Sequence, residues 1–371
     1  CCLGCGPKML RRIRIGLLEA ANATGLSRRI GRSAWRQSQL LILCYHGVTD
    51  GDLDQWNPSL FLNAQVFRRR MALLRDAGCS VLGLADALQR MERGTLPPRS
   101  VVLTFDDGFA DFNRVAWPIL REFGFPATLY LTTYYMVRNL PVFDPALGYL
   151  LWSGRNQQLD WPEITGRPVL LDASGRLQMS RALLTYALKK KLTALEKDGL
   201  LQDLATRLGL DYCALRESRA VSLINEDEAQ KLSAAGVDLQ MHTHRHRASI
   251  HQDRFLREVV DNRDCMASMG LQIPEHFCFP GGVYGVNDSQ WLRELGIKSA
   301  VTCDAGFAAP GSDLHSLPRV ADCSPFTEVE FVSWLYGTAA LLPHRGSAMN
   351  GIPPVQELET EIVPHVATPN G

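Results

Sequence analysis

Short apolar runs alternate with longer amphipathic segments along the chain from residue 41 onward. The apolar runs are four to six residues long and predict buried β-strands. They lie at 41–45, 79–82, 101–105, 127–132, 237–241, 276–279, 299–302 and 317–320. Between them, apolar positions recur every three or four residues, which predicts amphipathic α-helices. The predicted helices lie at 65–77, 84–93, 113–123, 225–236, 253–269 and 288–295.

Alternation of strands and helices predicts an α/β fold with a parallel sheet, because parallel strands need a crossover that a helix supplies. A sheet of about seven such strands most simply closes into a (β/α) barrel. Glycines mark the ends of several predicted helices, for example Gly78, Gly94 and Gly236. A left-handed residue commonly ends a helix, and glycine adopts that conformation without strain.

Three segments do not follow this alternation: 134–222, the tail 343–371 and the N-terminal segment 1–38. Residues 134–222 are longer than one barrel crossover requires. Because 182–208 is amphipathic, with Lys189 to Lys191 expected to face outward, we predict a helical insertion over the barrel rim. It either lines a substrate groove or only stabilises the fold. The tail 343–371 has no clear period and is rich in Pro, Gly and Asn, which predicts disorder.

The N-terminal segment, 1–38, is basic and precedes the predicted barrel domain, 39–330. From Lys8 to Arg36 it carries seven arginines and one acid, Glu19. It lacks the apolar stretch and cleavage site of a secretory signal peptide. Two interpretations stay open: a solvated helix packed on the domain, or a basic amphipathic helix that touches an anionic membrane surface.

Composition and charge exclude some classes of function. The 39 basic and 39 acidic residues cancel, so no global field favours nucleic acid. No apolar run approaches the ~20 residues of a membrane-spanning helix. We therefore expect a cytoplasmic protein or one peripheral to a membrane, with no nucleic-acid partner. The ten cysteines are mostly scattered singly and need no disulfide framework in a chain of this length.

Two adjacent carboxylates, Asp106 and Asp107, follow the predicted strand 101–105. Neighbouring acids repel each other unless a positive charge lies between them and their partners. A metal ion with histidine ligands would supply that charge, and the segment His242 to His246 follows the strand 237–241. The alternatives are two acids in a surface turn and an exposed histidine loop that binds no metal.

Position along the strands supports a shared site. His46, Asp106–Asp107, His242–His246 and Pro280–Gly281 each follow the carboxyl end of a different predicted strand. In a (β/α) barrel these ends gather on one face, where active sites are built. The sequence therefore predicts that the chemically marked residues converge.

The two motifs resemble those of the polysaccharide deacetylases, the NodB-homology group of carbohydrate esterases. Thr104 to Gly108 is similar to the family's T-F-D-D-G motif, and His242, Thr243 and His246 to its H-[S/T]-x-x-H motif, within a resemblance that covers roughly 99–322. The resemblance implies a distorted barrel with fewer than eight regular strands. It also implies that Asp107, His242 and His246 bind a divalent metal, most suitably Zn²⁺, with Asp106 as general base and Thr243 orienting a ligand.

The chain departs from the family pattern in two places. In the third motif, 277–282, Cys278 stands where the family commonly has an arginine, and Gly281 where it has a tyrosine. The Pro280–Gly281 turn either presents an N–H to an oxyanion or is purely structural. We expect Arg319, in the last predicted strand, together with Thr243, Pro280 and Gly281, either to contact the substrate or the oxyanion or to support the residues that do.

The late Leu-x-His motif of the family has no convincing match, because Leu314–His315 lacks the spacer residue. His46 is the candidate general acid, since a histidine with a pKa near ~6.5 can protonate a leaving amine. A role in orienting the substrate is the open alternative for His46.

The resemblance implies a metal-dependent hydrolase that removes N-acetyl groups from an amino-sugar polysaccharide or glycoconjugate. Two alternatives stay open, namely an O-acetyl esterase on a carbohydrate and a catalytically impaired carbohydrate-binding relative. The sequence contains neither a G-x-S-x-G elbow nor a phosphate-binding G-x-x-x-x-G-K-[S/T] loop, so nothing supports serine hydrolase or nucleotide-driven chemistry. The expected partner is an acetylated carbohydrate.

Overall fold

A computed structural model describes residues 8–249 and 251–343. The chain divides into two compact units: Leu140–Val221 form one, and the described residues before and after this segment form the other. The predicted disordered tail lies outside the described residues, apart from Pro343. Among the described residues, no helix has both the length and the apolar character needed to cross a membrane.

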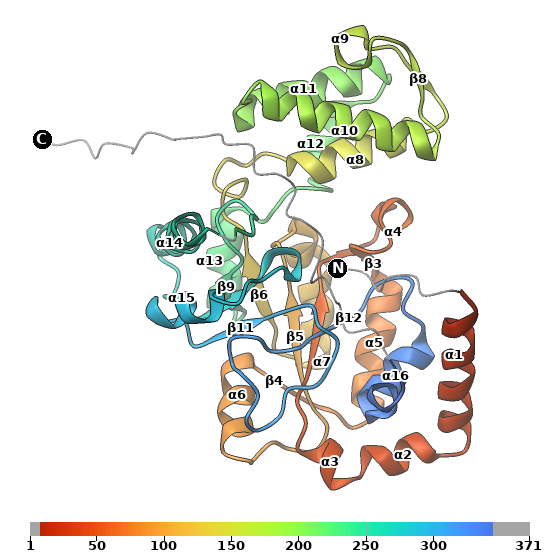
Figure 1. Ribbon diagram of the computed structural model, residues 1–371, viewed down its shortest axis with the longest axis vertical. Helices are drawn as coiled ribbons and strands as arrows, with labels where there is room; N and C mark the ends of the chain where they lie inside the picture. Colours follow the sequence, from red (N-terminus) through yellow and green to blue (C-terminus); the bar gives the residue numbers. More distant parts are fainter. Residues whose placement is uncertain (1–7, 250, 344–371) are drawn as a thin grey trace, which may run out of the picture. The chain divides into compact units, whose positions relative to one another are not determined.

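The larger unit is built on a parallel sheet, as the strand–helix alternation predicts (Figure 1). Its strands run in the order β11-β10-β9-β6-β5-β1-β12, and β4 pairs with β5 beside this path. The strands are β1 (Leu41–Tyr45), β4 (Ser80–Leu82), β5 (Ser100–Phe105), β6 (Thr128–Leu131), β9 (Asp238–Met241), β10 (His276–Cys278), β11 (Ser299–Val301) and β12 (Val320–Ala321).

The two ends of the sheet are bridged by one short segment. Leu317 pairs in parallel with Val301 at the end of β11, and Val320 pairs with Leu43 of β1. The predicted strand 317–320 is therefore wrong in its bounds, because its first residues bond to one edge of the sheet and its last residues to the other. The result is a distorted barrel, as expected.

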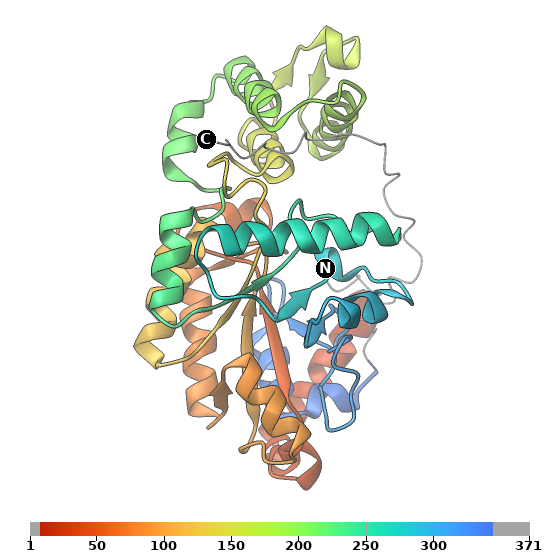
Figure 2. The same ribbon diagram turned by 90° about the vertical axis from the view of Figure 1, so that its left-hand side faces the viewer.

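Helices cover the outside of the sheet (Figure 2). They are α5 (Ala64–Asp76), α7 (Trp117–Phe123), α13 (Glu226–Ala234), α14 (Gln252–Ser268), α15 (Asp288–Glu294) and α16 (Glu328–Tyr336). The predicted helix 113–123 is correct only from Trp117, because a π-helix, Phe112–Ala116, precedes it. Every residue of β1 and β5 is buried, as expected for strands covered on both faces.

The interior of the barrel is filled by alternate residues of the strands. Ile42, Val102, Tyr130, Cys278 and Val301 share one buried cluster, which α6 (Leu84–Glu92) closes with its apolar face. Because alternate residues of a strand point to the same face, the next inward positions are those above this cluster, toward the carboxyl ends of the strands.

The larger unit also contains four further helices, two small strands and a 3₁₀ turn. Helices α1 (Lys8–Ala23), α2 (Leu26–Gly31) and α3 (Ala34–Gln37) form the basic N-terminal segment, and α1 packs beside α16. Strands β2 (Gly47–Thr49) and β3 (Phe61–Asn63) pair with each other, with α4 (Leu53–Trp56) between them in sequence. A 3₁₀ turn, Thr338–Leu341, follows α16.

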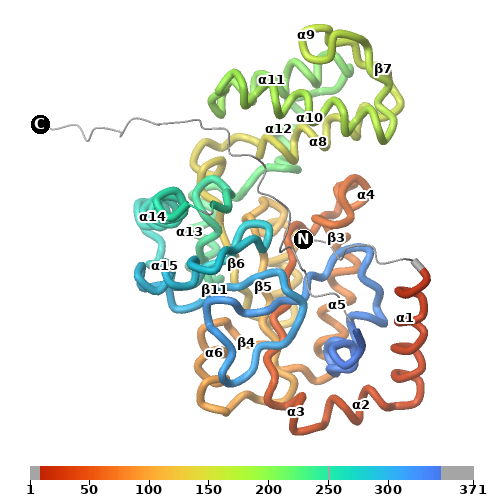
Figure 3. Tube along the Cα trace, in the orientation of Figure 1, coloured from red at the N-terminus to blue at the C-terminus, as the bar shows by residue number. Residues whose placement is uncertain are grey.

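The smaller unit is mostly helical (Figure 3). It contains α8 (Phe143–Ser153), β7 (Gln158–Leu159), α9 (Pro162–Thr165), β8 (Val169–Leu170), α10 (Ala173–Lys189), α11 (Ala194–Arg207) and α12 (Tyr212–Ser218). The predicted helix 182–208 is wrong in one respect, because it is broken into α10 and α11. Lys191 has a left-handed φ of 54°, and Thr193 then starts α11 with a capping box to Glu196.

Candidate active site

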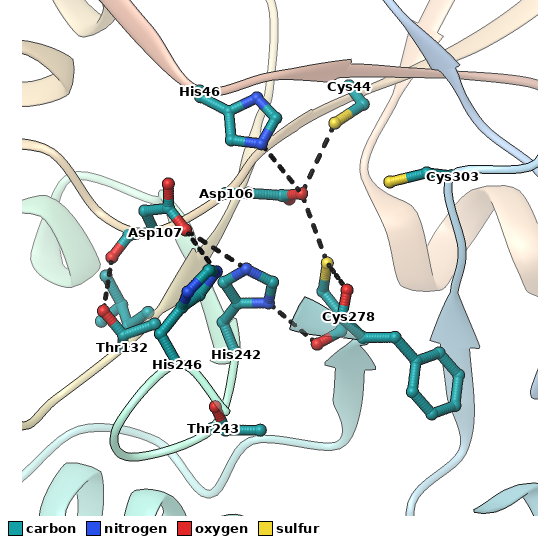
Figure 4. A network of polar contacts seen from close by, with 12 residues as sticks. Cys44, His46, Asp106, Asp107, Thr132, His242, Thr243, His246, Cys278 and Cys303 are labelled. Carbon is teal, nitrogen blue, oxygen red and sulfur yellow. Dashed lines mark hydrogen bonds and ion pairs between the residues drawn. The ribbon is translucent and has the colours of Figure 1, made fainter. Parts of the chain in front are cut away.

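Polar side chains from four strand ends meet at one edge of the barrel (Figure 4). His46 follows β1, Asp106 and Asp107 follow β5, His242 follows β9, and Cys278 ends β10. The parallel sheet places these carboxyl ends together, and the structure brings together His46, Asp106–Asp107 and His242–His246 as the sequence predicts.

Asp107, His242 and His246 form a group that could hold a metal ion. The Oδ1 atom of Asp107 lies 3.3 Å from Nε2 of His242 and 3.2 Å from Nε2 of His246. The three candidate ligand atoms all lie within 4.8 Å of one another. One carboxylate oxygen and two imidazole nitrogens are a donor set that suits Zn²⁺ and similar divalent ions.

Two observations test whether this group fits a cation. His242 Nδ1 lies 2.8 Å from the carbonyl oxygen of Cys278. Since a carbonyl only accepts, Nδ1 carries the hydrogen, and in the neutral ring Nε2 presents its lone pair to Asp107. Asp107 Oδ1 is itself buried without a hydrogen-bond partner among the described residues. Two lone pairs that face each other in a buried place need a cation or a proton between them, so the residues present fit a metal ion.

The backbone around Asp107 aims its side chain. Asp107 has a φ of 71° and Gly108 a φ of 86°. The Asp107 carbonyl accepts hydrogen bonds from the backbone N and the Oγ1 of Thr132, both at 3.2 Å. A Cβ at Gly108 would lie 2.7 Å from Leu131 Cδ2, so this turn has no room for a larger residue.

A hydrogen-bonded frame also holds the loop after β9. Thr243 is fully buried, and its Oγ1 accepts from the backbone N of Arg247 at 3.2 Å. It therefore braces the loop that carries His246, and it makes no hydrogen bond to a metal-ligand candidate in the described part of the chain. Arg245 pairs with Glu258 and Asp261 at 3.0 and 2.8 Å.

His244 lies apart from the candidate ligands. Its Nδ1 is 2.7 Å from Thr133 Oγ1, and its ring packs on Tyr134. Burial lowers the pKa of His244 to about 4. The spacing that pairs His242 with His246 rather than His244 therefore agrees with the geometry.

Asp106 is held by a fully buried arginine. Its Oδ1 and Oδ2 each accept one hydrogen bond from Arg319, at 2.7 Å. Burial acts to raise the pKa of Asp106, but the Arg319 guanidinium outweighs it and holds the pKa well below its usual range. Asp106 is thus an ionised carboxylate at the wall of the candidate metal site.

Arg319 is itself fixed from several directions. Its Nε donates to the Thr302 carbonyl at 2.8 Å, and one of its terminal nitrogens donates to Thr104 Oγ1 at 3.1 Å. The other terminal nitrogen lies 3.1 Å from Cys278 Sγ. Cys44 Sγ approaches the carboxylate that Arg319 binds and lies 3.5 Å from Asp106 Oδ2. The guanidinium therefore has one orientation available to it.

His46 completes the group on the side of β1. Its Nε2 lies 3.9 Å from Asp106 Oδ2, beyond direct hydrogen-bond distance. Burial lowers the pKa of His46, while the two carboxylates act against this effect. The lowered pKa favours the neutral ring at pH 7.

A scan against protein-family models matches residues 93–300 to polysaccharide deacetylases, which is more than half of the 371-residue chain. The chain belongs to the polysaccharide deacetylase family.

Among curated proteins, the deacetylase-family chain is 31% identical over 104 residues to YxkH of Bacillus subtilis (strain 168). It is 32% identical over 99 residues to the poly-β-1,6-N-acetyl-D-glucosamine N-deacetylase of Escherichia coli (strain K12). These matches cover 27% and 26% of the chain and only 35% and 14% of the two relatives.

Solved structures share the fold. The deacetylase PplD of Streptococcus pyogenes, in complex with acetate, superposes with a TM-score of 0.53 at 18% identity over 79% of this chain and 96% of that one. IcaB from Ammonifex degensii gives a TM-score of 0.51 at 14% identity, over 81% and 97% of the two chains.

The departures from the family pattern acquire a structural explanation. Cys278 takes the sequence place where the family motif commonly has an arginine, and Arg319, from the far end of the sheet, supplies the guanidinium beside Asp106. Pro280 and Gly281 form a tight 3₁₀ turn in which Gly281 has a φ of 62°. His315, whose Nε2 bonds to the Ile297 carbonyl at 2.8 Å, is buried apart from the site.

Sequence reasoning missed Asn262, which holds His242 in place. Its Oδ1 accepts from the backbone N of His242 at 3.1 Å, and its Nδ2 donates to Thr133 Oγ1 at 2.9 Å. A fully buried asparagine in the middle of α14 is unusual. Its place on the apolar face of the predicted helix 253–269 is the sequence feature that could have revealed it.

Proposed function

We propose that this chain is a metal-dependent hydrolase that removes N-acetyl groups from an amino-sugar polysaccharide or glycoconjugate. The observation that carries the proposal is the convergence of Asp107, His242 and His246 beside an Arg319-held Asp106, in a member of the polysaccharide deacetylase family. The relative from Escherichia coli named as a poly-β-1,6-N-acetyl-D-glucosamine N-deacetylase supports an N-acetylated sugar as substrate.

In this proposal Asp107 Oδ1, His242 Nε2 and His246 Nε2 bind one divalent ion, of which Zn²⁺ suits the donor set best. The ion would lower the pKa of bound water toward ~7 and polarise the acetyl carbonyl. Cys278 supports this arrangement, because its carbonyl holds His242 in the tautomer that leaves Nε2 free to bind.

Asp106 is the proposed general base. Arg319 keeps it ionised and oriented, so it can accept the proton that water releases during attack on the acetyl carbonyl. The low pKa of Asp106 makes it a weak base, and the bound ion would offset this weakness by acidifying the water that gives up the proton. His46 is the proposed acid that returns a proton to the leaving amine, since it lies beside Asp106 and the carboxylates of Asp106 and Asp107 favour its protonated form. The Pro280–Gly281 turn remains a candidate oxyanion donor.

Metal content tests the ligand assignment independently of activity. The protein is purified, stripped with a chelator, reloaded with Zn²⁺, and its bound metal measured by plasma mass spectrometry. His242→Ala and His246→Ala should each lose the ion. His244→Ala is the matched control, because it removes a histidine from the same loop, and it should keep the ion. Stoichiometric metal in both His242→Ala and His246→Ala would refute the assignment.

Acetate release from N-acetylglucosamine oligomers and from an O-acetylated glycan tests the reaction. Release from the oligomers that a chelator abolishes and Zn²⁺ restores is the expected result. Release from the O-acetylated glycan alone would identify an O-acetyl esterase. A folded, metal-loaded protein that binds both glycans and releases no acetate would be an impaired carbohydrate-binding relative.

A further inference from the structure

Helix α1 has an inner face that packs on the barrel domain. Leu18 is fully buried and Ala21 nearly so. Arg11 pairs with Glu330 of α16 at 3.0 Å, and Asn22 Nδ2 donates to Ser333 Oγ of the same helix at 3.3 Å. These contacts attach α1 to the domain, so its orientation on this surface is set.

A second face of α1, about 120° around the helix from the first, is apolar as well, and it is exposed. Met9, Leu10, Ile13 and Leu17 have exposed fractions of 72, 61, 51 and 53%. At 100° per residue these four side chains cover an arc of about 100° on the helix surface. A surface helix of a globular protein normally presents polar residues on its outer face. The outward apolar stripe of α1 therefore needs an explanation other than folding.

Exposed apolar side chains are concentrated here. Of the fifteen large exposed apolar residues in the described part of the chain, five lie between Met9 and Leu26. The other ten are spread over Trp35 to Leu341. Single exposed apolar residues are normal on a protein surface, whereas a contiguous group indicates an interaction site.

The charge of the same segment is strongly positive, although the whole chain is neutral. Glu19 is the one acid between Lys8 and Arg36. Arg11, Arg14 and Arg36 are used in contacts within the domain. Four further arginines are exposed: Arg12, Arg28, Arg29 and Arg32. The last three lie in or directly after α2, which contacts α1.

We propose that the outward face of α1, together with the exposed arginines of α1 and α2, docks on an anionic lipid membrane. An interfacial helix inserts its apolar face among the lipid headgroups while flanking cations bind the negative surface. A second copy of the chain is a poor alternative, because two-fold pairing of this surface would bring the arginines of both copies together. Docking would hold the active site near membrane-associated glycans.

Vesicle co-sedimentation of the whole chain tests the proposal. The protein should bind vesicles of phosphatidylcholine with about 30% phosphatidylglycerol, and bind pure phosphatidylcholine at least tenfold more weakly. Binding should weaken as salt rises to about 0.5 M, because salt screens the arginine–lipid attraction. Absence of binding to the anionic vesicles at low salt would overturn the proposal.

Two variants separate the apolar and the charged contributions. Leu10→Ser/Ile13→Ser/Leu17→Ser should reduce the partition coefficient about 10²-fold. The matched control, Leu170→Ser/Leu195→Ser/Ile273→Ser, removes three side chains that are 55, 72 and 74% exposed elsewhere and should bind as the wild type does. Equal losses in both triple variants would refute a specific docking face.

The charge variant Arg28→Gln/Arg29→Gln/Arg32→Gln should lose about 10²-fold, since each arginine near an anionic surface is worth about fivefold. It replaces exposed side chains only, so it tests the proposal even if the apolar variant fails to fold. Unchanged binding would overturn the proposal. Sedimentation velocity provides the last comparison: a wild-type dimer that the apolar variant makes monomeric, without vesicle binding, would assign the face to a second copy instead.

Discussion

Replacing Arg319 with glutamine removes the positive half of a buried ion pair and should strongly destabilise the larger unit. Asp106 and Arg319 are 2 and 1% exposed, and two hydrogen bonds of 2.7 Å join them. Without the guanidinium, the Asp106 charge stays in the barrel interior without the cation that now bonds both of its oxygens. Breaking such a pair by removing one partner costs about 3–5 kcal/mol in free energy of unfolding. Glutamine also lacks the donors that now reach Thr104 and Thr302.

A double-mutant cycle measures how much of this loss belongs to the pair. Urea unfolding of the wild type, Arg319→Gln, Asp106→Asn and the double variant gives four free energies of unfolding. Because the double variant buries no charge at either position, it should be less destabilised than the sum of the single variants by about 2 kcal/mol or more. Arg69→Gln is the matched control. Arg69 makes the same two-bond contact with Glu328, at 3.1 and 2.7 Å, but both side chains are exposed, so its loss should stay below about 1 kcal/mol.

The pH dependence provides a second check with a defined sign. Asp106 has a pKa below its usual range, so the pair stabilises the fold fully above the ordinary carboxyl pKa of about 4, and this stabilisation is lost as the pH falls through the folded pKa. In Arg319→Gln, the guanidinium no longer opposes the effect of burial, so the pKa of Asp106 rises. The variant can then protonate Asp106 at mildly acidic pH, and its deficit against the wild type should be smaller at pH 5 than at pH 8. Additive free energies in the cycle, or a deficit that grows on acidification, would refute the reasoning.

Three further outcomes are expected. Burial raises the pKa of Asp111 to about 8, so the free energy of unfolding of the wild type should fall from about pH 4 up through pH 8. Urea unfolding at pH 5 and pH 8 measures this fall, and Asp111→Asn should remove it. Gly282→Ala should lower the melting temperature more than Gly281→Ala: both glycines have positive φ, but only at Gly282 would a Cβ meet another residue closely, 2.6 Å from Cys303 Cβ. Equal shifts would contradict the crowding argument. His46→Gln should slow amide hydrolysis by about 10²–10⁴-fold yet spare 4-nitrophenyl acetate, whose leaving group needs no proton; equal losses on both substrates would remove His46 as the acid.

The sequence predicted the parts of the fold that depend on local patterns. Apolar runs such as 101–105 become strands because the sheet is covered on both faces. Successive residues of such a strand point to opposite faces, so nearly all of them must be apolar. The same reasoning placed Asp106 and His242 at strand ends, since each follows directly after such a run. The break between α10 and α11 was overlooked, although Thr193 and Glu196 carry the spacing of a capping box.

The pairing of Arg319 with Asp106 could not be predicted from local patterns, because 213 residues separate the two. It depends on the closure of the barrel, in which the segment from Leu317 to Ala321 bridges β11 and β1. Only that bridge brings Arg319 opposite the inward face of β5. The closure of the barrel also explains why Cys278 can stand where the family motif commonly has an arginine. The Arg319 guanidinium already fills the space beside the Asp106 carboxylate.

Backbone strain at the candidate metal site indicates why the loops after β5 and β9 have their conformations. Asp107, Thr243 and His246 have φ values of 71, 65 and 57°, in a region where residues other than glycine are uncommon and a β-branched threonine is an outlier. Each such residue costs about 1–3 kcal/mol and persists only where its surroundings hold it. A chain that only had to reverse direction could use glycine, as it does at Gly108. Strained residues that carry or brace the candidate ligands are instead explained by the need to aim two imidazoles at one carboxylate oxygen, so here the geometry of the site outweighed the ease of folding.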